Sequence, residues 1–314
     1  MPSSARSSAS APAAPSRSRH PPRPSTDARR GAAACAMKLR LYHHPDGARI
    51  AYREQGTGPR LVLWHSALLS HREFAPLVEE LEHRHRVVLP DLPLHGDSED
   101  RPRHPYTLDW LAEVVAGFCT DVAGPRPLVG GHGLGAELVL RAVTQRRMAP
   151  SRLILMPSAM HRAERDPRWR RWRMAARLGA VPGLDRLLMH GARAALPPSA
   201  GVRLSARADP AAGDLVRHAL AGAGGNVNLA RSWSRLVRRL PPGPRRELLD
   251  AYPGMAMPTL LLWADMDAQH PQAIAEEALD LLPNGLLRIV PGTGFLMAYD
   301  DPVCVAREIT AFCG

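Results

Sequence analysis

Short apolar runs alternate with longer amphipathic stretches from residue 38 to the end of the chain. Apolar runs of about four to six residues are typical of buried strands, and an apolar residue at every third or fourth position is typical of helices. The turn His44-Pro45-Asp46-Gly47 joins the first two runs and predicts a β-hairpin. Strands are predicted at 39–42, 49–54, 61–64, 87–90, 128–131, 152–156, 259–264 and 286–290, and helices at 71–83, 107–123, 134–145, 271–282 and 302–312.

The order of these elements predicts an α/β protein. Continuous apolar strands that are each followed by a helix are typical of a mostly parallel sheet with helices on both faces. The alternation occupies residues 37–157 and 258–314, and residues 158–257 interrupt it with helical and loop character. We therefore predict one core built from the two outer segments, with a mainly helical cap inserted between them.

Residues 1–36 do not share this pattern. They are rich in serine, alanine, proline and arginine and show no apolar periodicity, so they cannot bury enough surface to offset the entropy of folding. We predict a disordered tail there. The chain has no run of about 18 apolar residues, as a spanning helix needs, and its tail lacks the apolar stretch of a secretory signal. A cytoplasmic protein without a membrane partner is expected.

The formal net charge of +11 is concentrated in the tail and in the cap. Residues 160–240 carry 16 arginines against five acidic residues, and the tail carries six against one. This distribution favours an acidic or carrier-bound small molecule at the cap over nucleic acid. In the cap, Trp169 and Trp172 alternate with arginines and are candidate substrate-binding residues. Alternatively, both tryptophans lie on one apolar helix face that packs against the core.

Five segments at the ends of predicted strands carry recognisable motifs. The segments are Leu61-Val-Leu-Trp-His65-Ser66, Pro90-Asp-Leu-Pro-Leu-His-Gly-Asp-Ser98, Leu128-Val-Gly-Gly-His-Gly-Leu-Gly135, Pro258-Thr-Leu-Leu-Leu-Trp-Ala-Asp-Met-Asp267 and Pro291-Gly-Thr-Gly-Phe-Leu-Met-Ala-Tyr-Asp-Asp-Pro302. In this order, they resemble the oxyanion-hole strand, the loop after the next strand, the nucleophile elbow, the acid-bearing strand and the histidine loop of the α/β-hydrolase superfamily. The resemblance covers about residues 37–314 and implies the α/β-hydrolase fold.

Two residues that the resemblance makes catalytic are replaced. The frame G-x-nucleophile-x-G falls on residues 131–135, so Gly133 stands at the nucleophile position. Phe295 stands at the position of the triad histidine, and no histidine follows His270. Asp267 matches the triad acid. Acyl transfer through a covalent serine intermediate is therefore not expected.

The remaining polar residues are candidates for acid/base chemistry. Asp267, His132 and His65 can each move a proton or orient a ligand, although each can equally be structural. His270 lies three residues after Asp267 and either approaches it across the loop or sits on the surface. The four cysteines are far apart, so neither a disulfide framework nor a metal site is predicted. No cofactor is expected.

The substitution at Gly133 predicts free space at the elbow. We expect a ligand or water to occupy the volume of the missing nucleophile, lined by Ser66, Ala67, Leu134 and Phe295. The backbone N–H of Leu134, together with that of Ser66 or Ala67, can form an anion hole at the start of the following helix.

Three functions fit these expectations. The first is a non-hydrolytic acid/base enzyme of epimerase, cyclase or lyase type that acts on a small organic molecule, as some superfamily members with altered triads do. The second is a pseudoenzyme that binds a ligand without turnover. The third is a hydrolase that activates water without a serine nucleophile.

Overall fold

The computed structural model describes residues 37–99, 101, 103–162, 167–178, 202–223, 227–239 and 245–314. The predicted tail, residues 1–36, lies outside this range. Among the described residues, no helix is both long enough and apolar enough to cross a membrane.

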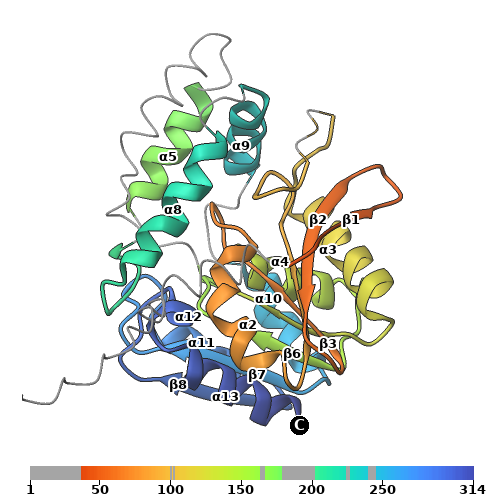
Figure 1. Ribbon diagram of the computed structural model, residues 1–314, viewed down its shortest axis with the longest axis vertical. Coiled ribbons are helices and arrows are strands. Elements are labelled where there is room, and N and C mark those ends of the chain that lie inside the picture. The colour runs from red at the N-terminus through yellow and green to blue at the C-terminus, as the bar shows by residue number, and fades with distance from the viewer. Residues whose placement is uncertain are drawn as a thin grey trace, which may run out of the picture.

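Eight strands form a single sheet in the order β1-β2-β4-β3-β5-β6-β7-β8 (Figure 1). The β1–β2 and β2–β4 pairs are antiparallel and the other neighbouring pairs are parallel. The sheet confirms the predicted hairpin and mostly parallel core. The strands are β1 Leu39–His43, β2 Arg49–Gln55, β3 Arg60–Trp64, β4 Arg86–Pro90, β5 Leu128–Gly131, β6 Arg152–Leu155, β7 Thr259–Ala264 and β8 Gly285–Val290.

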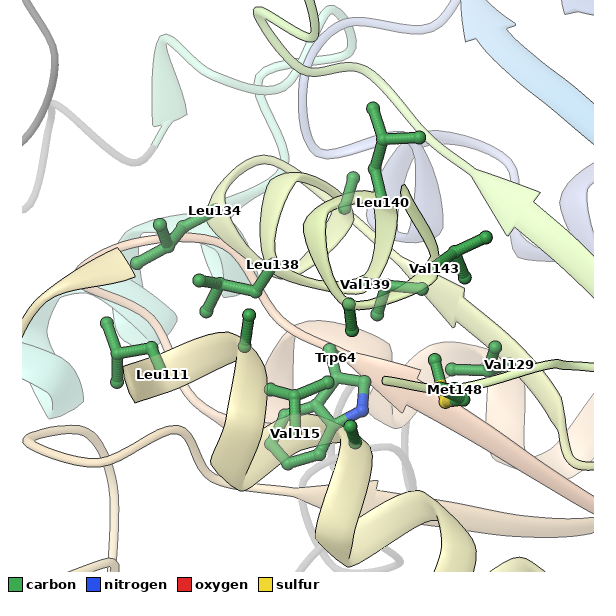
Figure 2. Packing of buried hydrophobic residues seen from close by; sticks show 14 of the residues in the cluster. Trp64, Leu111, Val115, Val129, Leu134, Leu138, Val139, Leu140, Val143 and Met148 are labelled. Carbon is green, nitrogen blue, oxygen red and sulfur yellow. The ribbon is translucent and has the colours of Figure 1, made fainter. Parts of the chain in front are cut away.

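Helices cover both faces of this sheet because each presents an apolar stripe to it. One face packs against α3 (Leu108–Ala123), α4 (Leu134–Thr144), α10 (Arg246–Ala251) and α11 (Ala273–Leu279). The other packs against α2 (Ala75–Leu81), α12 (Met297–Asp300) and α13 (Pro302–Cys313). Figure 2 shows Trp64 of β3 among apolar side chains of α3 and α4. This packing fixes the start of α4 above the carboxyl end of the sheet.

The predicted helix at 71–83 is divided in the structure. A 3-10 turn, η1 (His71–Phe74), precedes α2, and the Ser70 side chain accepts a hydrogen bond from the N–H of Arg72. Pro76 lies in the first turn of α2, where its missing N–H costs no intrahelical bond. The η1 turn holds the side chain of Glu73 in the interior of the protein, where it is 1% exposed.

The insertion between β6 and β7 is mainly helical in its described residues, as predicted. It contains α5 (Pro167–Leu178), α8 (Pro210–Ala223) and α9 (Val227–Arg239), followed by α10 and the short turn η2 (Tyr252–Gly254). α5 and α9 pack against each other away from the sheet, as Figure 1 shows. α8 packs on the loop that follows β8, because its residues share an apolar cluster with Leu69 and Leu296. The cap therefore covers the end of the sheet at which the elbow lies.

Candidate active site

The turn from β5 into α4 has the shape of a nucleophile elbow. Gly133 sits at its apex with φ 51° and ψ −118°, a backbone conformation that residues with side chains rarely adopt. The two flanking glycines allow a close crossing. A Cβ on Gly135 would lie 2.2 Å from the carbonyl oxygen of Trp64, and one on Gly131 would lie 2.5 Å from the nitrogen of Ala136. The backbone of the motif is thus complete, although its apex carries no side chain.

The expected free space at Gly133 is not present, and that prediction was wrong. A Cβ built on Gly133 would lie 2.6 Å from the Cβ of Ser66 and 3.4 Å from the Cζ of Phe295. Ser66 follows β3 and takes up the volume beside the apex. The serine that replaces the usual glycine after His65 therefore fills the space that the missing nucleophile leaves.

Ser66 belongs to a buried cluster that the sequence did not reveal. Its N–H donates to Oε2 of Glu73 at 2.7 Å, and its hydroxyl lies 3.0 Å from both carboxylate oxygens. The same carboxylate accepts a hydrogen bond from Nδ1 of His132. Because Glu73 bonds the N–H of Ser66, that group is not free for an anion hole, which corrects one of the two expected pairings. Glu73 lies four residues before Leu77 on one face of the predicted helix, but an acidic residue is equally typical of a solvated position, so the sequence carried no signal for this cluster.

The cluster fixes the hydrogen-bonding state of His132. Burial by itself would raise the pKa of Glu73, but the charge of His132 and its hydrogen bond outweigh burial and hold that pKa below its usual value. The carboxylate of Glu73 binds Nδ1 of His132 and so leaves Nε2 as the second hydrogen-bonding atom of the ring. Nε2 is buried, and no hydrogen-bond partner for it exists among the described residues. His132 therefore has one ring nitrogen next to the elbow that Glu73 does not bind.

Phe295 lies against two imidazole rings at this site. Its ring centroid is 4.1 Å from that of His132 and 5.2 Å from that of His270. His270 in turn places Nδ1 2.8 Å from Oδ2 of Asp267. The acid after β7 thus has an imidazole partner, supplied from three residues along its own loop and not from the loop after β8.

The loop after β7 also bonds Asp267 through the backbone. The N–H groups of Gln269 and His270 point to Oδ1 of Asp267 at 2.9 and 3.3 Å. Burial would raise the pKa of Asp267, but the hydrogen bond and charge of His270 outweigh it and lower that pKa. Two carboxylate–imidazole pairs, Glu73–His132 and Asp267–His270, therefore contact one phenylalanine.

His65 is held entirely by the backbone. Its Nδ1 lies 2.8 Å from the carbonyl oxygen of Ser66, and its Nε2 accepts the N–H of Leu92 at 2.9 Å. Burial lowers its pKa, which favours the neutral ring. Since both ring nitrogens are hydrogen-bonded to the backbone, His65 has no free nitrogen with which to accept a proton from a substrate.

The second expected pair of anion-hole donors consists of the N–H groups of Leu134 and Ala67. Leu134 is the first residue of α4, so its N–H has no intrahelical acceptor. Among the described residues, neither this N–H nor that of Ala67 has a hydrogen-bond partner. Ala67 is exposed and Gly133 is partly exposed, so the two N–H groups lie at the accessible edge of the site. Trp169 and Trp172 lie in α5, but their side chains are outside the description.

A second polar cluster lies beneath η1. His71 Nδ1, Asp91 and Asp97 are close enough to share a cation. The guanidinium of Arg53 already lies among them, 3.2 Å from His71 Nδ1, 2.6 Å from Asp97 and 3.9 Å from Asp91. Because a fixed positive charge occupies this position, the cluster is an ion-pair network that braces the loop after β4.

Acid should weaken this network. Burial opposes ionisation of Asp91, but the hydrogen bond and charge of His71 outweigh it and lower the pKa from 3.8 to about 2. A carboxylate with a lowered pKa stabilises the fold above pH 4, and this stability is lost as the pH falls through 2. About 2 kcal/mol is therefore expected to disappear in this window.

Urea unfolding of the wild-type protein and of Asp91→Asn at several pH values between 2 and 5 measures this loss. The variant should show a shallower fall in the free energy of unfolding. Equal slopes would contradict the assignment. If the variant does not fold, carboxyl-carbon NMR of the wild-type protein reports the pKa of Asp91 directly.

Comparison with known proteins agrees with the fold. The family model described as alpha/beta hydrolase family matches residues 61–306. The uncharacterized hydrolase YugF of Bacillus subtilis is 23% identical over 273 residues, covering 85% of this chain and 95% of YugF. The magnesium-chelatase 30 kDa subunit of Rhodobacter capsulatus is 26% identical over 235 residues, covering 75% of this chain and 80% of that protein.

Solved structures show the same architecture. An alpha/beta hydrolase fold protein from Burkholderia ambifaria superposes with a TM-score of 0.71 at 23% identity, over 88% of this chain and 99% of that chain. The family model covers most of the sequence, including the strands and loops that build the elbow. The chain belongs to the alpha/beta hydrolase family.

Proposed function

We propose that this protein is a non-hydrolytic acid/base enzyme that moves a proton on a carbon next to a carbonyl group of a small organic molecule. Reactions of the epimerase, cyclase or lyase type begin with such a step. The observation that carries the proposal is the buried Nε2 of His132, which has no partner among the described residues while Glu73 holds the other ring nitrogen.

Each group has a role that follows from its contacts. His132 Nε2 accepts the proton, and Glu73 orients the ring and stabilises the imidazolium that forms. The N–H groups of Leu134 and Ala67 stabilise the negative oxygen of the resulting enolate in this proposal. No covalent intermediate is expected, because Gly133 offers no nucleophile.

The second carboxylate–imidazole pair gives the site a means to return a proton. His270 contacts Phe295, as His132 does, and Asp267 orients it. Two bases that contact one phenylalanine allow a proton to be removed by one group and delivered by another. Asp267 acts here as a positioning residue, through His270.

The cap supports an acidic or carrier-bound substrate. α5 carries five arginines, α9 carries four, and neither helix contains an acidic residue. Arginine binds carboxylate and phosphate groups with paired donors. We propose that this charge attracts the acidic portion of the substrate, so binding should weaken as the salt concentration rises.

Water activation is the second candidate, because an imidazole held by a carboxylate can also deprotonate water. YugF is named a hydrolase, whereas the magnesium-chelatase subunit is not. Two isotope measurements separate the two reactions. Carbon-bound deuterium from D2O would mark proton transfer, and 18O from labelled water in a carboxylate product would mark hydrolysis.

The test uses N-acetylcysteamine thioesters and simple ketones as probes, with loss of the α-proton signal followed by NMR in D2O. His132→Gln should keep a hydrogen bond to Glu73 but slow exchange at least about 100-fold. His44→Gln is the matched control, because His44 is a buried histidine paired with Asp46 at 2.8 Å outside the site. Equal rates for wild type and His132→Gln, or no exchange by the wild type, would contradict the proposal.

A further inference from the structure

A second polar side chain near the elbow lacks a hydrogen-bond partner. Ser158 follows β6 and is 1% exposed, and within the described part of the chain no group bonds its hydroxyl. His132 is 2% exposed, and its Nε2 likewise has no hydrogen-bond partner among the described residues. Interiors of folded proteins rarely leave such atoms unpaired, because an unpaired buried polar group costs free energy. Two unpaired polar groups at one site indicate that they bind a molecule that is not part of the chain.

The strand register brings the two residues to the same place. The N–H of Met156 donates to the carbonyl of Gly131 at 2.9 Å, and the N–H of Gly133 donates to the carbonyl of Pro157 at 3.0 Å. Ser158 and His132 are each adjacent in sequence to one partner of this last bond. Their backbones therefore run side by side at the carboxyl end of β5 and β6, next to the N–H of Leu134, which no group of the described residues bonds.

Some other buried polar side chains in the core have partners for all their polar atoms. The hydroxyl of Ser205, which is 6% exposed, donates to Oδ1 of Asp300 and accepts the N–H of Asp209 at 3.1 Å. His65 uses both ring nitrogens. Other buried side-chain atoms also lack a partner among the described residues, such as Nε2 of His71 and Nδ1 of His85, but Ser158 and His132 adjoin the elbow.

We propose that Ser158 and His132 together bind a hydroxyl group of the substrate. A hydroxyl is both donor and acceptor, so in the bound substrate it can accept the hydrogen of Ser158 and donate to Nε2 of His132, and it must release Nε2 before that nitrogen takes the carbon-bound proton. A carboxylate could satisfy Ser158 but offers no proton to Nε2. The proposal rests on the proposed function and narrows its substrate class to hydroxylated carbonyl compounds.

Thermal stability of the ligand-free protein gives a test that does not need turnover. Ser158→Ala removes an unpaired buried hydroxyl, so the Tm should stay the same or rise by about 2–4 °C. Ser205→Ala is the matched control and should lower the Tm, because it leaves its partners unpaired. A lower Tm for Ser158→Ala would show that the hydroxyl is bonded within the fold and would overturn the proposal.

Binding of two matched probes tests the ligand chemistry. The N-acetylcysteamine thioesters of 3-hydroxybutyrate and of butyrate differ by one hydroxyl. The wild-type protein should bind the hydroxylated thioester at least about 10-fold more tightly, and Ser158→Ala should lose this preference. Equal binding of the two by the wild type, binding of neither, or a preference that survives in Ser158→Ala would overturn the proposal.

The two proposals fail in different measurements. Proton exchange without selectivity for the hydroxyl would contradict only the role of Ser158. Selectivity without proton exchange would contradict only the proposed reaction.

Discussion

Replacing Gly133 with serine, which restores the residue type expected at an elbow, should lower the free energy of unfolding by about 4 kcal/mol. Two costs combine. The new Cβ would lie 2.6 Å from the Cβ of Ser66, a contact that requires the backbone or Ser66 to move. The residue must also keep φ near 51°, where a side chain is strained. Urea unfolding monitored by circular dichroism measures the loss.

Gly292→Ser is the matched control for strain alone. Gly292 also has a positive φ, 68°, but a Cβ there would meet no atom within 4 Å. Its cost should be about 1–2 kcal/mol. The double variant Gly133→Ser/Ser66→Gly removes the collision and should recover most of the difference between the two glycine variants. If Gly133→Ser costs no more than Gly292→Ser, Ser66 does not fill the volume at the apex.

Glu137→Gln is expected to lower the free energy of unfolding by about 3–5 kcal/mol. Glu137 lies in the first turn of α4 and is 7% exposed, and its Oε2 is 3.0 Å from Nη2 of Arg245, which is 6% exposed. Arg245 leads the chain from the cap back to the core and donates to the carbonyl of Met160 at 2.6 Å. The neutral amide leaves a buried guanidinium without its counter-charge, which is the large cost.

Glu247→Gln provides the control for this variant. The Glu247 carboxylate is 63% exposed and lies 3.9 Å from Arg141, so solvent screens the pair. Its loss should change the stability by less than about 0.5 kcal/mol. Chemical unfolding of both variants at neutral pH compares them directly. Equal effects would show that the Glu137–Arg245 pair does not connect the cap with α4 energetically.

The predictions for Gly133 and Glu137 concern the function because Gly133 is the apex of the elbow and Glu137 lies in the first turn of the helix that follows it. Gly133 and Ser66 decide whether a nucleophile can be accommodated, and Glu137 anchors the helix that supplies the N–H of Leu134. A site with a rigid frame and no nucleophile suits proton transfer by His132 better than acyl transfer.

The fold was predictable because its signals are local. The apolar runs of β3, β5 and β7 and the glycines of the elbow are contiguous in sequence, and strand–helix alternation restricts the topology to a mostly parallel sheet. One predicted boundary differs from the structure. The predicted helix at 71–83 begins as the 3-10 turn η1, and Pro76 lies in the first turn of the α-helix that follows.

The candidate site was predictable only in part. Gly133, Phe295 and Asp267 followed from motif positions, but the pairing of His132 with Glu73 joins residues 59 positions apart. Nothing in the periodicity of residues 71–83 separates Glu73 from a solvated acidic residue. Similarly, the spacing of Asp267 and His270 left both a contact and a surface position open, and only the loop geometry shows the 2.8 Å contact.

The sequence by itself determined that this chain forms an α/β-hydrolase core with a basic helical cap and that Gly133 and Phe295 stand at the motif positions of the nucleophile and the triad histidine. Side-chain type and spacing suffice for these conclusions. Only the tertiary structure decided that Ser66 fills the place beside Gly133, that Glu73 holds His132, and that His270 partners Asp267. The physical reason is that burial and hydrogen bonding of a polar side chain depend on neighbours from distant segments, which the chain brings together only when the sheet and its helices pack.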